Sequence, residues 1–246
     1  MIRAVIFDLW NTLIYDDPEI SEQRNQLRLR SAQDALATFG HAYEAADIEA
    51  AFLAAGTELA RIHETERDIS MRGRTVLYLR HLDGELGDRL NDDAWQRLDE
   101  ALLTPALTHR PPMLPGAVEL VAALKSSGLR VGLISNAGIT PGVVLARIMD
   151  DMGLGQHFDL TVFSDEVELS KPSPAIFAHA LDELGLAPDE AVFVGDQPIL
   201  DVQGARRAGM WMVQIGDLAC EEEQPHARVE ALDELLPTLR SLALVP

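Results

Sequence analysis

Several polar residues of this 246-residue chain are of types that could act together in a displacement reaction. Each follows, directly or within a short loop, an apolar run: Asp8, Ser135 with Asn136, Lys171, and Asp196 with Asp201. A carboxylate in such a position can attack phosphorus or an electrophilic carbon, and a covalent aspartyl ester then divides one difficult displacement into two easier ones. An ammonium group beside it would offset the charges of the carboxylate and of a transferring phosphoryl group.

Asp196 and Asp201 lie five residues apart, across a turn that enters a predicted helix. Two carboxylates placed so close would repel each other without a cation, and a set of oxygen ligands suits Mg²⁺. The simpler alternative is that Asp201 caps a helix beginning at Val202. Glu166 could assist a metal from a neighbouring loop, although a solvated acid is the plainer interpretation.

Composition supports a functional role for Lys171, because the chain has only two lysines and the other, Lys125, lies in an amphipathic helical pattern. The alternative for Lys171 is a surface lysine before a proline. The hydroxyl of Ser135 and the backbone around Asn136 could donate hydrogen bonds to phosphoryl oxygens. The alternative for this pair is a turn that ends a strand.

The elements that must position these residues are short apolar runs without alternation, which are typical of strands buried on both faces of a parallel sheet. The runs are Ala4–Phe7, Arg130–Ser135, Leu160–Phe163, Ala191–Val194 and Trp211–Ile215. Helical patterns separate the later runs, over Pro115–Ser127 and over Pro174–Gly185, where Ser173 is a plausible N-cap. We therefore predict an α/β fold with a doubly wound, Rossmann-like parallel sheet, which binds ligands at the carboxyl ends of its strands.

Residues 15–112 have a different pattern, without a convincing strand and with apolar residues spaced near 3.6. Asp16-Asp17-Pro18 and Pro111-Pro112 mark the limits of this segment. We predict an all-helical cap domain of roughly four helices over residues 15–112. It is inserted in a core domain made of residues 1–14 and 113–246.

Taken together, these segments resemble the haloacid dehalogenase superfamily of aspartate-nucleophile hydrolases. The first motif of that family is Asp-x-Asp-x-Thr, which Asp8 and Thr12 match. The second is a Ser or Thr, the third a Lys, and the fourth a Gly-Asp with a further acid five residues on. The matching residues are Ser135, Lys171, Asp196 and Asp201.

The resemblance implies that Asp8 is the nucleophile and that Lys171 supports it. It further implies Mg²⁺ held by Asp8, the backbone carbonyl oxygen of Trp10 and Asp196, with Asp201 in or near the metal site. The resemblance also implies that the phosphate is bound by Thr12, Ser135, Asn136 and Lys171. The implied substrate is a small phosphorylated metabolite.

One position departs from the family pattern. Phosphatases of the superfamily carry a second Asp two residues after the nucleophile, as general acid and base, and Trp10 stands there instead. Dehalogenases of the superfamily also lack this acid, because halide leaves without a proton. Their fourth motif lacks the metal-binding acids that Asp196 and Asp201 retain here. A 2-haloacid dehalogenase is therefore the alternative function, and a catalytically weak binding or regulatory protein is a further one.

Arginines of the predicted cap are candidates for binding a substrate anion, although a helix face covered with salt bridges is the simpler interpretation. The candidates are Arg24, Arg28, Arg61, Arg72 and Arg74.

Composition excludes several classes of function. The formal net charge of −20 and the pI near 4.6 disfavour nucleic acid and an anionic membrane surface as partners. Cys220 is the only cysteine, which rules out an intrachain disulfide and a cysteine-ligated cluster. The sequence lacks a signal-peptide pattern and a run of about 20 apolar residues. We predict a cytoplasmic enzyme, monomeric or homodimeric, that acts on a small molecule.

Overall fold

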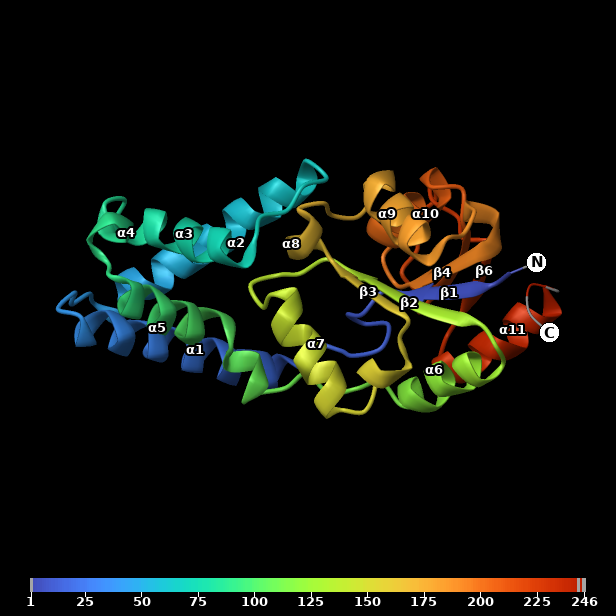
Figure 1. Ribbon diagram of the computed structural model, residues 1–246, viewed down its shortest axis with the longest axis horizontal. Coiled ribbons are helices and arrows are strands. Elements are labelled where there is room, and N and C mark those ends of the chain that lie inside the picture. The colour runs from blue at the N-terminus through green and yellow to red at the C-terminus, as the bar shows by residue number, and fades with distance from the viewer. Residues whose placement is uncertain (1, 243, 245–246) are drawn as a thin grey trace.

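The sheet is the centre of the molecule. In the computed structural model, which describes residues 2–242 and 244, six parallel strands pair in the order β3-β2-β1-β4-β5-β6 (Figure 1). The strands are β1 (Ala4–Phe7), β2 (Arg130–Ser135), β3 (Leu160–Phe163), β4 (Ala191–Gly195), β5 (Trp211–Ile215) and β6 (Ala227–Val229). This order confirms the predicted α/β class with a doubly wound parallel sheet.

β1 lies in the middle of the sheet, and its four residues AVIF are all buried. Phe7 pairs with Leu133 of β2 on one side and with Val194 of β4 on the other. The strand order reverses at β1, which is where doubly wound sheets bind ligands. Asp8, the next residue, therefore emerges between the carboxyl ends of β2 and β4.

Helices cover both faces of the sheet (Figure 1). One face packs against the helices α6 (Ala117–Ser126), α7 (Gly142–Asp151) and α11 (Leu235–Ser241). The other face packs against α9 (Pro174–Leu184) and α10 (Gly204–Arg207), and a short helix, α8 (Ser164–Val167), follows β3. Each face has its own apolar core, which explains why the strands read as continuous apolar runs.

Several local predictions agree with the structure. Ser173 caps α9, because its side chain accepts a hydrogen bond from the backbone N–H of Ala175, and Gly185 ends the helix in the left-handed conformation. The helix predicted over Pro115–Ser127 is shorter and begins at Ala117. The sixth strand, β6, was not predicted, since it is only three residues long and its middle residue, Arg228, is charged and exposed.

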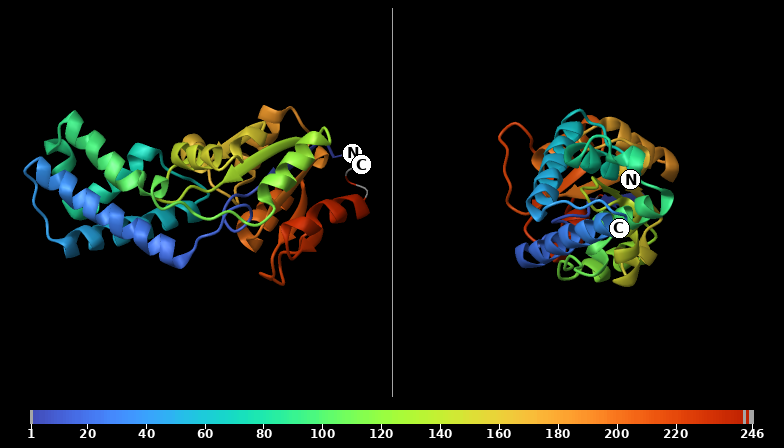
Figure 2. Two further views of the ribbon diagram at one scale, coloured as in Figure 1. Left: turned by 90° about the horizontal axis from the view of Figure 1, so that it is seen from below. Right: turned by 90° about the vertical axis from the view of Figure 1, so that its left-hand side faces the viewer.

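Residues 15–112 are helical and lie at one end of an elongated molecule (Figures 1 and 2). The helices are α1 (Pro18–Thr38), α2 (Ala45–Glu64), α3 (Met71–Leu82), the short α4 (Leu86–Arg89) and α5 (Asp92–Leu103). They enclose a third apolar cluster of their own. Their division from the sheet as a separate cap domain, at the boundaries given above, stays a prediction. Within the part of the chain that the structure describes, no helix has the length and apolar character needed to cross a bilayer.

Candidate active site

Three carboxylates meet at the carboxyl ends of β1 and β4. One oxygen from each of Asp8, Asp196 and Asp201 lies within 4.8 Å of the other two, and all three residues are buried. Asp8 follows β1 and is held by its backbone N–H, which donates to the Val194 carbonyl oxygen of β4 at 2.8 Å. The acids predicted to share one site therefore do so.

Lys171 lies between two of these carboxylates. Its Nζ donates to Asp8 Oδ1 at 2.5 Å and to Asp201 Oδ1 at 2.7 Å, and the side chain is only 2% exposed. The backbone of Lys171 is fixed by Asn136, whose Oδ1 accepts from the Lys171 N–H at 2.8 Å and whose Nδ2 donates to the Lys171 carbonyl oxygen at 3.0 Å. A surface lysine is excluded by this burial.

Asp201 does not cap a helix that begins at Val202. It lies inside a π-helical turn, Pro198–Gln203, and its Oδ2 accepts a hydrogen bond from the backbone N–H of Gln197 at 2.9 Å. Gly195, the last residue of β4, makes this approach possible: a Cβ there would lie 2.7 Å from the Cβ of Asp201. The glycine before Asp196 is thus required by packing.

Replacement of Gly195 by alanine should displace Asp201, because the added methyl group meets the carboxylate side chain and not open space. Overpacking of this kind lowers the free energy of unfolding by about 1–3 kcal/mol. Chemical denaturation of the variant measures the loss. Gly56→Ala in α2, where a Cβ meets nothing within 4 Å, is the matched control and should not be destabilised. Equal stability of both variants would contradict the packing argument.

The electrostatics of the cluster favour an additional cation. Burial raises the pKa of the Asp8 carboxyl to about 7 against the attraction of Lys171. Burial and the charge of Asp201 likewise raise the pKa of Asp196. Burial alone would lower the pKa of Lys171, but attraction to Asp201 and Asp8 outweighs it and raises that pKa. One ammonium, that of Lys171, thus stands against three buried carboxylates. A divalent cation bound by the carboxylate oxygens would offset the remaining negative charge, so the donor set fits such an ion.

Of the residues predicted to bind phosphate, Lys171 and Thr12 contact Asp8 directly. Thr12 Oγ1 lies 3.5 Å from Asp8 Oδ2, and Thr12 is fully buried. Ser135 ends β2 and is also fully buried, with its hydroxyl 3.5 Å from the Asn136 carbonyl oxygen. Both hydroxyl contacts are long, so each group can turn toward a bound oxygen. The assignment of these residues to phosphate stays a prediction.

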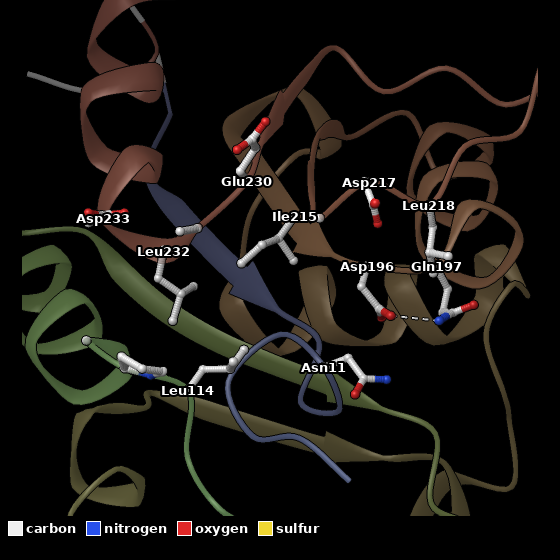
Figure 3. Close-up of a pocket in the computed structure, with 14 residues that line it drawn as sticks. Asn11, Leu114, Asp196, Gln197, Ile215, Asp217, Leu218, Glu230, Leu232 and Asp233 are labelled. Atoms are coloured by element: carbon white, nitrogen blue, oxygen red, sulfur yellow. Dashed lines mark hydrogen bonds between the residues drawn. The ribbon is translucent and has the colours of Figure 1, made fainter. Parts of the chain in front are cut away.

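The residues after Asp8 form a tight turn that aims Trp10 and Asn11 at different cavities. Trp10 forms an isolated bridge with Ile14 and lines a cavity of about 410 Å³, which lies between α1 and the loop after β2. Asn11 adopts φ 55° and lines a larger cavity of about 710 Å³, which Asp196 also borders (Figure 3). Asp196 of the carboxylate cluster therefore borders one cavity, and Trp10, two residues after Asp8, lines the other.

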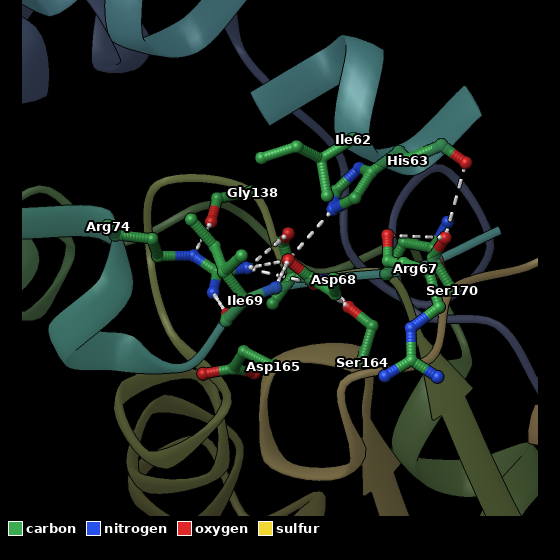
Figure 4. A network of polar contacts seen from close by, with 12 residues as sticks. Ile62, His63, Arg67, Asp68, Ile69, Arg74, Gly138, Ser164, Asp165 and Ser170 are labelled. Carbon is green, nitrogen blue, oxygen red and sulfur yellow. Dashed lines mark hydrogen bonds and ion pairs between the residues drawn. The ribbon is translucent and has the colours of Figure 1, made fainter. Parts of the chain in front are cut away.

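A buried polar network connects the helical segment to the loops after β2 and β3 (Figure 4). Asp68 Oδ2 accepts from Ser164 Oγ at 2.5 Å and pairs with Arg74 at 2.9 Å. Arg74 Nε donates to the Gly138 carbonyl oxygen at 2.6 Å, and the backbone N–H of Ala137 donates to Ser164 Oγ at 2.7 Å. The loop that contains Asn136 is thus anchored from both sides. Sequence reasoning did not predict Asp68 or Ser164, since their partners are distant in the chain.

The other residues proposed from the sequence, Glu166 and the arginines of the helical segment, differ in how deeply they are buried. Glu166 is exposed and lies outside the carboxylate cluster, as its interpretation as a solvated acid requires. Arg61 is exposed, and the half-exposed Arg72 pairs with Asp99 at 3.0 Å. Only the buried arginines of the helical segment, Arg24, Arg28 and Arg74, face inward.

The sheet order and the site together define a doubly wound α/β protein with its clustered carboxylates at the strand-order reversal. Residues 2–209 match the haloacid dehalogenase-like hydrolases. The chain belongs to this family and is an enzyme of the hydrolase class.

Named relatives differ in how much of the chain they match. The chain is 38% identical to phosphoserine phosphatase of Thermus thermophilus over 119 residues, which are 48% of this chain and only 46% of that protein. It is 28% identical to glyceraldehyde 3-phosphate phosphatase of Methanopyrus kandleri over 99% of both chains. Among solved structures, 2-haloacid dehalogenase from Pseudomonas syringae has a TM-score of 0.71 at 23% identity, covering 98% of this chain and all of that one. At that identity the likeness concerns the fold.

Proposed function

We propose that the protein is a Mg²⁺-dependent hydrolase of a small phosphate ester, with Asp8 as the nucleophile. The observation that carries this proposal is the buried cluster of Asp8, Asp196 and Asp201 around a single ammonium, Lys171. A dehalogenase needs no such excess of negative charge. The relatives named for phosphatase activity support the same substrate class.

In this mechanism an Asp8 carboxylate oxygen attacks phosphorus, the ester oxygen leaves with the electron pair of the P–O bond, and the aspartyl phosphate is then hydrolysed by water. Lys171 keeps Asp8 oriented and offsets the phosphoryl charge. Thr12, Ser135 and the backbone of Asn136 donate hydrogen bonds to phosphoryl oxygens. The expected Mg²⁺ ligands are Asp8, the Trp10 carbonyl oxygen and Asp196, with Asp201 close by, and the ion would neutralise developing charge.

Trp10 favours a second candidate function, that of a 2-haloacid dehalogenase. The indole at this position cannot protonate a leaving alkoxide, and halide needs no proton. A scaffold with weak catalysis, acting by binding, is the third candidate. We favour the phosphate ester because Asp196 and Asp201 would otherwise repel each other in a buried site.

A panel of phosphate esters and 2-haloacids, each assayed with Mg²⁺ and with EDTA, separates the three candidates. We expect release of phosphate only with Mg²⁺. Halide release that persists in EDTA would establish the dehalogenase instead. Inactivity on both panels would favour the binding protein.

The metal assignment is tested by Asp196→Asn. We expect a strong loss of Mg²⁺ affinity with the fold intact, because an amide is a poorer ligand and the charge of the cluster falls. Calorimetric titration with Mg²⁺ measures the affinity. Asp217→Asn removes an exposed acid of the neighbouring cavity and should leave the affinity unchanged. Equal affinity in wild type and Asp196→Asn would remove the assignment.

We further propose that the helical segment of residues 15–112 acts as the cap domain over this site and that the enzyme works in the cytoplasm. Its partner is a small molecule and neither nucleic acid nor a membrane, since a formal charge of −20 repels polyanions. Whether the enzyme is a monomer or a homodimer is answered by measuring its mass in solution.

A further inference from the structure

The cavity beside Trp10 contains more positive charge than its own residues neutralise. Of the described residues that line it, the charged ones are Arg24 and Arg28 from α1 and Asp16 just before that helix. The side chain of Asp16 is 53% exposed, whereas that of Arg24 is 9% exposed. One carboxylate that faces water therefore stands against two buried guanidinium groups.

Arg24 has a free donor in this cavity. Its second terminal nitrogen donates to Asp16 Oδ1 at 2.6 Å and to Ser21 Oγ at 2.7 Å, while its first is buried and has no hydrogen-bond partner among the described residues. A buried donor without a partner is unfavourable, because it has lost water and gained nothing in return. The Arg24 guanidinium also lies over the Trp10 ring, 5.9 Å from its centroid, which helps to fix its position.

Arg28 carries its charge without an acidic partner. Its hydrogen bonds within the described chain go to the Leu102 carbonyl oxygen, to Asn25 Oδ1 and, at 3.4 Å, to Thr140 Oγ1. Burial and the charge of Arg24 lower its pKa to about 10. An anion in the cavity would offset the repulsion between the two guanidinium groups and give Arg28 the charged partner that it lacks.

The cavity also adjoins the reacting centre. Trp10 follows Asp8 by two residues, and Asn136, another lining residue, holds the backbone of Lys171, whose Nζ contacts Asp8. A volume of about 410 Å³ has room for the remainder of a small ester whose phosphoryl group lies at Asp8. We propose that Arg24 and Arg28 bind a second anionic group of the substrate, a carboxylate or a second phosphate. This inference rests on the proposed phosphate-ester function and names its substrate class.

The test compares three two-carbon phosphate esters that differ only in the second group. They are 2-phosphoglycolate, the amide of 2-phosphoglycolate, in which the second group is uncharged, and ethane-1,2-diol bisphosphate. Binding to Asp8→Asn in the presence of Mg²⁺ is measured by calorimetry, so that no turnover is needed. We expect one or both anionic esters to bind about 10–100-fold more tightly than the amide, since each charge-assisted hydrogen bond contributes at this level. The stronger of the two identifies the anion as carboxylate or phosphate.

Arg24→Gln in the same background should abolish this preference while the amide binds as before, which also shows that the variant is folded. Arg24→Lys should retain part of the preference. The matched control is Arg72→Gln, because Arg72 also lies over a tryptophan, Trp95, but outside the cavity, and it should keep the full preference.

The outcomes separate this inference from the function on which it rests. Equal binding of the three esters, or a preference that survives in Arg24→Gln, would overturn the second-anion site alone. Failure of all three esters to bind would overturn the phosphate-ester function and the inference with it.

Discussion

Asp8→Asn is expected to lower turnover of any substrate of this enzyme by more than about 10³-fold, because a neutral amide is a poor nucleophile and removal of a nucleophile is among the largest single losses known. The fold should survive, since the amide oxygen can still accept the hydrogen bond from Lys171 Nζ. The measurement is kcat on the best substrate of the panel, with Glu166→Gln, an exposed acid outside the cluster, as control.

A second readout tests the same carboxylate without a substrate. Beryllium fluoride with Mg²⁺ should form a phosphoaspartate mimic on wild-type Asp8 and none on Asp8→Asn. If turnover by Asp8→Asn stays within tenfold of the wild-type value, the assignment of Asp8 as the nucleophile is wrong.

Trp10→Asp is expected to raise kcat/KM for alkyl phosphates by up to about 10²–10⁴-fold, the usual contribution of general acid–base catalysis. Aryl phosphates should gain less, because their leaving groups depart with little proton assistance. A carboxylate misplaced by about 1 Å would lose much of the gain. The measurement is kcat/KM for an alkyl phosphate without a second charged group, for an aryl phosphate and for a 2-haloacid.

The neighbour of Trp10 affects this result. Arg24 has an unpartnered donor beside the indole, so a new carboxylate at position 10 can pair with it and turn away from the leaving group. We therefore expect a larger gain from Trp10→Asp when Arg24→Gln is also present, measured on the alkyl phosphate without a second charged group. The four proteins form a double-mutant cycle that isolates this coupling. A drop on both phosphates, with Mg²⁺ still bound, would contradict the missing-acid argument and favour the dehalogenase, with Trp10 as an apolar wall.

Much of the candidate site could be predicted from sequence because strand ends in a parallel sheet meet at one edge. The short apolar runs placed Asp8 and Asp196 at the carboxyl ends of predicted strands, and the structure brings them together. The side-chain directions in the helical segment were beyond such reasoning. Arg24 and Arg72 look alike in a polar helical pattern, yet one is buried over Trp10 and the other half exposed. Only tertiary packing distinguishes them.

Other features were missed for related physical reasons. Asp68 is one acid among many in its segment, and it becomes notable only through contacts with Ser164 and Arg74. β6 is too short and too exposed at the sheet edge to give a periodic signal. The fourth motif includes Gly195, but the close approach of this residue to Asp201, which explains the glycine, is visible only in the coordinates.

The position of β1 has a consequence for how the chain is made. This strand is synthesised before both of its hydrogen-bonding partners, which are β2, at residues 130–135, and β4, at residues 191–195. The strand that carries Asp8 is apolar and therefore stays without its full set of hydrogen bonds until both β2 and β4 have been synthesised. Helices α1–α5 can pack on one another earlier. Contacts this distant in sequence form slowly, and an unpaired apolar strand can join another chain. Products of interrupted translation that end before β4 should be inactive and prone to aggregate.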